Sequence, residues 1–190
     1  MKLFIILILG FISLGNAQIN HGTIIIDSVY SHYLENEFQE NPTRLVSIYL
    51  PPGYEESNQH YPVIYFLHGF TASHEIPDMG VILDHAINSR RIRPIIFVVP
   101  NQKTTYGGSF YSNTGVFGNW QDFTAIDLVA HIDKNYRTIT NKESRGITGH
   151  SMGGYGALKI AMHHPDIFST VYAINPGALT IVREYGPNSN

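Results

Sequence analysis

The sequence contains no cysteine and carries little positive charge. Without cysteine, the chain has no disulfide, no cysteine nucleophile and no lipid attached to an N-terminal cysteine, although its compartment stays open. Lys and Arg number 12 against 15 Asp and Glu, so the net charge is −3, and basic residues cluster only at Arg90, Arg91 and Arg93. Because nucleic acids bind to basic surfaces, we expect no nucleic-acid partner.

Motifs for metals and nucleotides are also missing. The 10 histidines form no H-E-x-x-H motif and show no other metal-ligand spacing, so we expect no metal and no other cofactor. The glycine-rich stretch 149–156 has no following lysine, which excludes a nucleotide-phosphate loop. Apolar residues make up 43% of the chain, with 12 Tyr and 10 Phe, which is ample for one domain with a packed core.

The first 17 residues have the composition of a secretory signal peptide. A basic start at residues 1–2 precedes a nearly unbroken apolar run over 3–14, and small residues occupy the two positions that a signal peptidase reads, 15 and 17. The run is too short to span a bilayer comfortably. We therefore expect cleavage after Ala17, a domain over 18–190 that is secreted or periplasmic, and no membrane attachment once the signal peptide has been removed.

Apolar patterns along the rest of the chain predict alternating strands and helices. The expected strands are residues 23–34, 44–50, 63–67, 95–99, 145–148 and 168–174, and the expected helices are 78–90, 120–136 and 152–163. The first two strands suit an antiparallel pair at a sheet edge. The series as a whole predicts an α/β fold with helices on both faces of the sheet. Between them, residues 102–119 form a long polar and aromatic loop of the kind that often carries function.

One motif organises the chain: Gly149-His-Ser-Met-Gly153, which has the G-x-S-x-G form of a nucleophile elbow. A sharp turn between the expected strand 145–148 and helix 152–163 would hold Ser151 exposed and strained at its tip. Gly149 and Gly153 lack a Cβ, so the strand and helix can approach closely. The helix N-terminus would offer free backbone N–H groups to an oxyanion beside Ser151. The motif therefore predicts a nucleophilic serine.

Four stretches together resemble one enzyme family: residues 61–69 (YPVIYFLHG), 107–111 (GGSFY), 119–123 (NWQDF) and 149–157 (GHSMGGYGA). The chain is similar, over about 22–178, to the esterase D-like branch of the α/β-hydrolases. That branch includes feruloyl and other carbohydrate esterases, S-formylglutathione hydrolases and mycolyl-transferring enzymes. The resemblance implies the α/β-hydrolase fold, with a mostly parallel sheet, and a small-molecule or carbohydrate ester as substrate.

The resemblance also implies residue roles. Ser151 matches the nucleophile. The backbone N–H groups of Met152 and Phe70 match the two donors of the oxyanion hole, which a tetrahedral intermediate needs because charge develops on its oxygen. We expect the Phe70 side chain to be a pocket wall or a core residue.

The chain departs from the family after Ser151, where only 39 residues remain. In the family order, an acid and then a histidine follow the nucleophile. We expect Asp166, His68 and His150 to be structural, and His163 and His164 to lie at the end of the elbow helix. We expect Glu184 to lie in the tail, and His74, His85 and His131 to lie on the surface. We therefore expect the acid and histidine of the triad, and the last strands of the sheet, to be missing from a chain that is incomplete at its C-terminus.

Three functions remain open from the sequence. The first is a secreted serine esterase that acts through a Ser151 acyl-enzyme. The second is a non-catalytic binding module, a hydrolase scaffold that has lost its base. The third is an acyltransferase, in which an alcohol rather than water accepts the acyl group. The sequence leaves the oligomeric state open.

Overall fold

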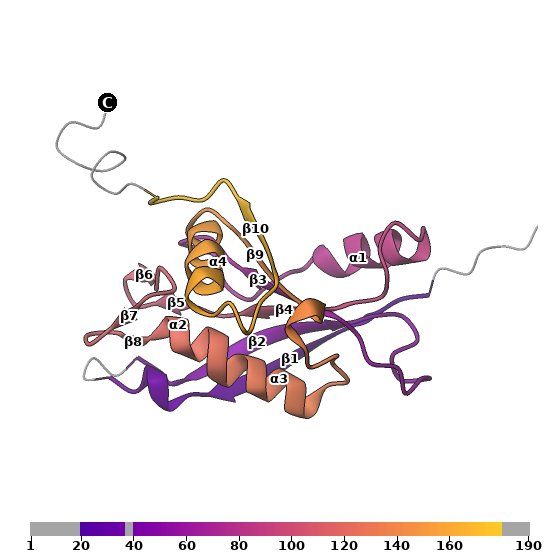
Figure 1. The fold of residues 1–190 in the computed structure, drawn as a ribbon, viewed down its shortest axis with the longest axis horizontal. Coiled ribbons are helices and arrows are strands. Elements are labelled where there is room, and N and C mark those ends of the chain that lie inside the picture. Colours follow the sequence, from indigo (N-terminus) through magenta and orange to yellow (C-terminus); the bar gives the residue numbers. More distant parts are fainter. Residues whose placement is uncertain (1–19, 37–39, 180–190) are drawn as a thin grey trace, which may run out of the picture.

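The computed structural model describes residues 20–36 and 40–179, so the expected signal peptide lies outside the described residues. Six strands form the central sheet in the order β1-β2-β4-β3-β9-β10 (Figure 1). Their bounds are β1 Thr23–Tyr30, β2 Thr43–Leu50, β3 Val63–Leu67, β4 Ile96–Pro100, β9 Arg145–His150 and β10 Thr170–Ile174. Within the described part of the chain, no helix is long and apolar enough to cross a bilayer.

The sheet is mostly parallel. The strands β4, β3, β9 and β10 run parallel to one another, whereas β2 is antiparallel to both β4 and β1. The expected antiparallel pair at a sheet edge is thereby confirmed. The first expected strand is four residues too long: it ends at Tyr30, because the Ser31 hydroxyl accepts a hydrogen bond from the amide of Tyr33 and starts the short 3-10 helix η1 (His32–Leu34).

Three helical segments pack on the sheet. They are α1 (Met79–Asn88), a continuous segment formed by α2 (Trp120–Asp122), the π-helical turn η2 (Phe123–Leu128) and α3 (Val129–Asn135), and α4 (Met152–His163). A short 3-10 helix, η3 (Lys142–Ser144), precedes β9. The expected helix over 120–136 is present, but its middle turn is π-helical rather than α-helical.

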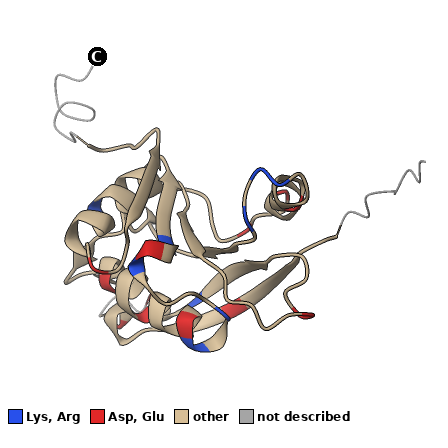
Figure 2. Ribbon diagram, turned by 45° about the vertical axis from the view of Figure 1, so that its right-hand side comes forward, with Lys and Arg blue, Asp and Glu red and all other residues tan. Residues whose placement is uncertain are grey.

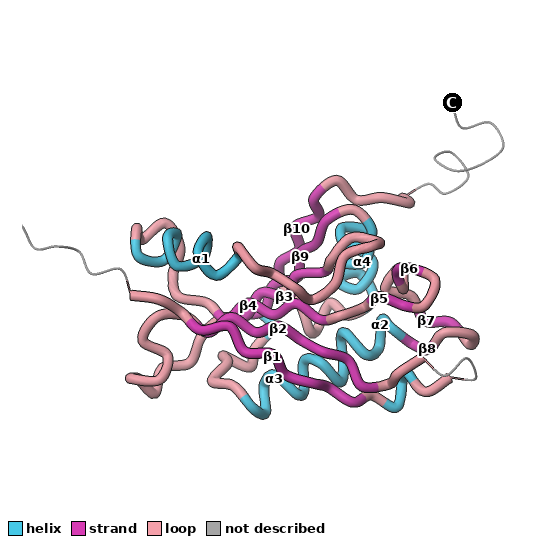
Figure 3. The backbone as a smooth tube through the Cα atoms, turned by 180° about the vertical axis from the view of Figure 1, so that it is seen from behind, coloured by secondary structure: helices cyan, strands magenta, loops and turns pink. Residues whose placement is uncertain are grey.

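Side chains of β3 alternate between two hydrophobic clusters, because neighbouring residues of a strand point to opposite faces. Tyr65 belongs to the larger cluster, with Ile132 of α3 and Ile160 of α4. Its neighbour Phe66 packs against the smaller cluster, which contains Leu83 of α1. The helices therefore cover both faces of the sheet, as the sequence predicts. Figures 1 and 3 show α1 well apart from α3 and α4.

The expected functional loop over 102–119 consists of two short antiparallel ribbons. One pairs β5 (Lys103–Thr104) with β6 (Gly107–Gly108), and the other pairs β7 (Asn113–Thr114) with β8 (Gly118–Asn119). Between the ribbons, Phe110 and Tyr111 both have positive φ angles, of 51° and 50°. Non-glycine residues seldom adopt this conformation, so the surrounding contacts must hold the turn in place.

Candidate active site

Ser151 lies between β9 and α4 in a strained backbone conformation, with φ 55° and ψ −117°. Three backbone hydrogen bonds hold it there. Its amide donates to the carbonyl of Ile174 at 3.0 Å, and its carbonyl accepts from the amides of Tyr155 at 3.1 Å and Gly177 at 3.0 Å. The turn is therefore tied to the helix that follows it and to the end of β10.

Two glycines let this turn form against β3. A Cβ on Gly153 would lie 1.8 Å from the carbonyl oxygen of Leu67, the last residue of β3. A Cβ on Gly149 would lie 2.4 Å from the carbonyl group of Gly153. Any side chain at either position would separate the start of α4 from the ends of β9 and β3.

The close approach brings two backbone amides to the same end of the sheet. Met152 is the first residue of α4, where an amide has no partner within the helix. Phe70 follows the end of β3 by three residues. Among the backbone hydrogen bonds of the described residues, neither amide is a donor. Both N–H groups are thus available to an acceptor outside the backbone.

A pocket of about 290 Å³ opens beside Ser151 and is lined by Phe70, Phe110, Ser151, Met152, Gly177 and Ala178. The rings of Phe70 and Phe110 form one wall, with their centroids 5.6 Å apart. Of the two places expected for the Phe70 side chain, a pocket wall or the core, the structure shows the pocket wall. Sequence reasoning did not assign Phe110, Gly177 or Ala178 to the site. The signals for Phe110 were its place in an aromatic loop and in the family-like stretch 107–111.

The ribbon β5–β6 packs directly on this pocket. A Cβ on Gly107 would lie 2.4 Å from the ring of Phe70, and a Cβ on Gly108 would lie 2.2 Å from the sulfur of Met152. The amide of Phe110 also donates to that sulfur at 3.4 Å. The loop over 102–119 therefore contacts the side chains of Phe70 and Met152, the two residues whose amides have no backbone acceptor.

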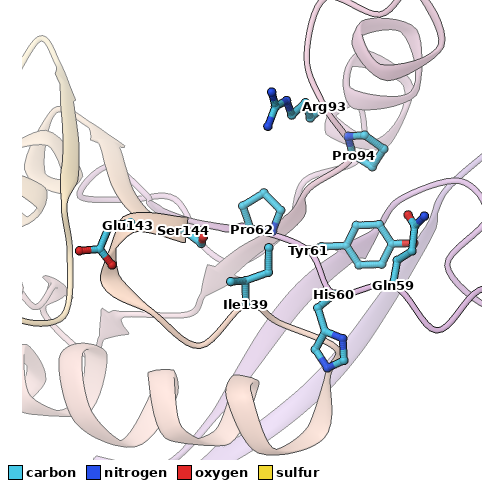
Figure 4. Close-up of a pocket in the computed structure, with 9 residues that line it drawn as sticks. All are labelled: Gln59, His60, Tyr61, Pro62, Arg93, Pro94, Ile139, Glu143 and Ser144. Carbon is cyan, nitrogen blue, oxygen red and sulfur yellow. The ribbon is translucent and has the colours of Figure 1, made fainter.

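A second, larger hollow of about 440 Å³ lies at the opposite end of the sheet (Figure 4). Its lining includes Pro62, Pro94 and Ser144, which come directly before β3, near the start of β4, and before β9. It therefore lies at the amino ends of the parallel strands. Ligand sites of open α/β sheets lie at the carboxyl ends. The smaller pocket beside Ser151 is the better candidate.

His68 is buried and structural, as the sequence predicts. Its Nε2 accepts a hydrogen bond from the amide of Gln102 at 2.8 Å, so its Nδ1 carries the hydrogen and donates to the carbonyl of Gly69 at 2.7 Å. Burial lowers the pKa of the His68 imidazole below its ordinary value of 6.5, so the ring stays neutral. Both ring nitrogens are occupied, which leaves His68 unable to act as a base for Ser151.

Of the other histidines, His150 directly precedes Ser151, and a Cβ on Gly69 would lie 3.8 Å from its Nδ1. His163 and His164 both bond the side chain of Gln121, at 2.8 Å and 3.2 Å. His150 and His85 are exposed, as is Asp166 in the turn after α4. Glu184 lies outside the described residues. In the part of the chain that the structure describes, no side chain forms a hydrogen bond with the Ser151 hydroxyl.

The expected surface position of His74 is wrong. Its ring is buried, and burial lowers its pKa. His131 is half-buried rather than on the surface, since its Nε2 lies 2.8 Å from a carboxylate oxygen of Asp27 on β1. Across residues 20–36 and 40–179, no group of three or more His, Asp or Glu side chains is arranged to hold a metal ion.

Comparisons with known proteins match this chain to esterases and to an S-formylglutathione hydrolase. A family model described as "Putative esterase" matches residues 38–180. Esterase Rv1288 of Mycobacterium tuberculosis is 31% identical over 147 residues, which cover 74% of this chain and 30% of that protein. S-formylglutathione hydrolase of Paracoccus denitrificans is 29% identical over 181 residues, which cover 85% of this chain and 61% of that protein.

The solved structure of a ferulic acid esterase superposes with a TM-score of 0.71 and 26% identity, covering 82% of this chain and 58% of the esterase. The chain thus spans less than two thirds of the length of each of these three proteins.

Proposed function

The chain belongs to the esterase family and has the α/β-hydrolase fold, and from this premise we propose that the protein hydrolyses carboxylic esters through a Ser151 acyl-enzyme. One observation carries the proposal. Ser151 has the backbone strain expected of a nucleophile elbow, with φ 55°, and its side chain lines a pocket together with Phe70 and Met152.

In the proposed reaction, the Ser151 oxygen bonds to the carbonyl carbon of the ester while a general base takes the hydroxyl proton. The carbon–oxygen bond to the alcohol then breaks, and the alcohol leaves with that proton. A water molecule attacks the acyl-enzyme in the same way and releases the acid. No step requires a metal or another cofactor.

The amides of Met152 and Phe70 are the proposed oxyanion donors. Support comes from their free N–H groups and from the two side chains that line the pocket with Ser151. The partial positive charge at the start of α4 also favours a negative oxygen there. Each such donor contributes about 10²–10³ in rate in enzymes of this kind.

The reaction requires a general base, and no described side chain bonds the Ser151 hydroxyl. A base from outside the described residues is therefore part of the proposal. The substrate we propose is a small-molecule or carbohydrate ester whose acyl group contacts the rings of Phe70 and Phe110. A ferulic acid esterase among the similar structures supports this class of substrate.

We also propose that residues 1–17 direct export and are then removed, so that the mature protein is secreted or periplasmic. The basic start, apolar run and small residues of this segment support the proposal. N-terminal sequencing of exported protein should begin at Gln18. An intact Met1 would contradict it.

Ester hydrolysis by the full-length protein tests the proposed activity. We expect turnover of 4-nitrophenyl esters, and the Ser151→Ala variant should lose at least about a thousandfold in kcat. Ser144→Ala is the matched control, because Ser144 lines the hollow at the other end of the sheet. Equal activity of Ser151→Ala and the wild type would refute the proposal.

The absence of a base among the described residues favours a second candidate, a binding module that keeps the pocket without turnover. Saturable binding of an ester with no release of acid, unchanged in Ser151→Ala, would favour this module over the esterase. An acyltransferase would give the same loss in Ser151→Ala, but added alcohol would divert the acyl group from water.

A further inference from the structure

Tyr111 is a buried side chain that joins two parts of the candidate site. Its exposed fraction is 0%, and its hydroxyl donates to the backbone carbonyl of His68 at 2.9 Å. His68 directly follows β3 and comes two residues before Phe70. Burial raises the pKa of the Tyr111 hydroxyl well above its ordinary value, so this group keeps its proton and remains a donor.

The ring of Tyr111 lies against the other half of the site. Gly156, on the second turn of α4, has no side chain, and a Cβ there would lie 2.4 Å from the Tyr111 ring. The ring therefore fills the space that a side chain on α4 would otherwise occupy. One residue thus contacts both α4, which begins at Met152, and the segment that carries Phe70.

The His68 ring and the Gly69 carbonyl make the other hydrogen bonds that hold the segment His68–Phe70. The His68 ring accepts from the Gln102 amide and donates to the Gly69 carbonyl, which also accepts from the Ala72 amide at 3.2 Å. Of these bonds, the first ties the segment to the loop after β4, the second lies within the segment, and the third joins it to Ala72, two residues further along the chain. The Tyr111 hydroxyl is the donor that ties it to the turn packed on α4.

The turn around Tyr111 is built to hold this position. Phe110 and Tyr111 have φ angles of 51° and 50°, which bulky residues adopt only when the surroundings impose them. The Ser109 hydroxyl accepts from the Tyr111 amide at 3.1 Å, and the Ser112 hydroxyl donates to the Phe110 carbonyl at 2.9 Å. Lys159 of α4 donates to the Ser112 hydroxyl at 2.7 Å. The turn is therefore fastened to α4 as well.

We propose that Tyr111 is a positioning residue that sets the spacing between the Phe70 and Met152 amides. Its hydroxyl holds the segment that carries the Phe70 amide, and its ring holds α4, the helix that begins at Met152. The inference rests on the proposed function, because that spacing matters only if both amides bind one oxyanion. Small errors in such geometry reduce the rate of the chemical step rather than the binding of the substrate.

The test is Tyr111→Phe in the full-length protein, since it removes the hydroxyl and keeps the ring. We expect kcat for a 4-nitrophenyl ester to fall about tenfold, with KM unchanged within about twofold. The matched control is Tyr61→Phe. Tyr61 is also buried and loses one hydroxyl contact, at 3.0 Å to Ser57, but it lies at the amino end of β3. This control should keep the wild-type kcat.

Amide hydrogen exchange supplies a readout that does not need activity. The amides of Ala72 and Gln102 bond the Gly69 carbonyl and the His68 ring. Both should exchange faster in Tyr111→Phe and at the wild-type rate in Tyr61→Phe. Unchanged exchange, or a fall in kcat that both variants share, would overturn the role of Tyr111. An inactive wild type would count against the proposed function alone, and the exchange data would still decide the inference.

Discussion

Ser151 has a backbone conformation that costs on the order of 1–3 kcal/mol for a residue with a side chain. Three backbone hydrogen bonds, to Tyr155, Ile174 and Gly177, help to offset this conformational cost. Such strain persists only where the surrounding structure fixes it, and it gathers at functional sites. The residue-scale geometry therefore agrees with a serine that has been positioned for chemistry.

Gly153 is the residue that most strictly sets this geometry. In Gly153→Ala the new Cβ would meet the Leu67 carbonyl oxygen at 1.8 Å, and backbone atoms on both sides must move apart. We expect the free energy of unfolding to fall by about 3 kcal/mol, which urea denaturation measures. The control is Gly115→Ala, where a Cβ would have no atom within 4 Å. Equal stabilities for the two variants would show that β3 and α4 are not in this contact.

At the scale of the elements, an ion pair between buried Arg145 and partly buried Asp133 joins α3 to the start of β9. Arg145 donates to a carboxylate oxygen of Asp133 at 2.6 Å and to the carbonyl of Ile167 at 3.0 Å. Thr138 donates to the other oxygen of Asp133 at 2.7 Å. The pair holds the start of β9, the strand that leads to Ser151, against α3.

Removing the acid should therefore be costly. In Asp133→Ala the Arg145 guanidinium, whose side chain is 6% exposed, loses its counter-charge. We expect a loss of about 3–5 kcal/mol in the free energy of unfolding, measured by urea denaturation. Lys134→Ala, an exposed position on the same helix, should change stability by less than about 0.5 kcal/mol. A loss below 1 kcal/mol in Asp133→Ala would mean that water reaches Arg145.

The sequence predicted the elements well where apolar periodicity was strong. The helix of α4 and the buried strand β3 have the predicted bounds. The π-helical turn η2 was not predictable from periodicity. There the Thr124 hydroxyl donates to the Trp120 carbonyl at 2.7 Å and competes for the acceptor of a normal helical bond. Gln102, from a distant loop, also donates to the same hydroxyl, a contact that periodicity does not reveal.

At the scale of the whole molecule, the sequence predicted the mostly parallel sheet with helices on both faces, but not the order of its strands. It also singled out Ser151, Phe70 and Met152, which the structure brings to one pocket. Phe110 was missed because its position follows from a strained turn rather than from any periodic pattern. Of the sequence features, charge said least about the fold and the site. Figure 2 shows the charged residues dispersed over the ribbon.

The stability of the whole molecule should fall in mild acid. Burial lowers the pKa of three imidazoles, His68, His74 and His164, below 6.5 in the folded protein. The unfolded chain therefore binds more protons than the folded chain once the pH drops below about 6.5, and each proton favours unfolding. The stabilising effect of the neutral rings is complete above that pH and is lost as the pH falls toward the folded pKa values.

Urea denaturation at pH 7.5 and pH 5.5 checks this expectation. The free energy of unfolding should be lower at pH 5.5, and His68→Gln should show a smaller difference between the two pH values than the wild type. His85→Gln, at an exposed position of α1, is the matched control. The same pH dependence in His68→Gln and His85→Gln would show that the buried His68 ring does not contribute to the loss of stability in acid.

The central claim is that Ser151 is an activated nucleophile, and covalent labelling tests it most directly. The full-length protein would be treated with a fluorophosphonate, which reacts with activated serines, and its peptides would be analysed by mass spectrometry. We predict one adduct, on the peptide that carries Ser151, and none in the Ser151→Ala variant. An unlabelled wild type, or an adduct that persists in Ser151→Ala, would contradict the claim.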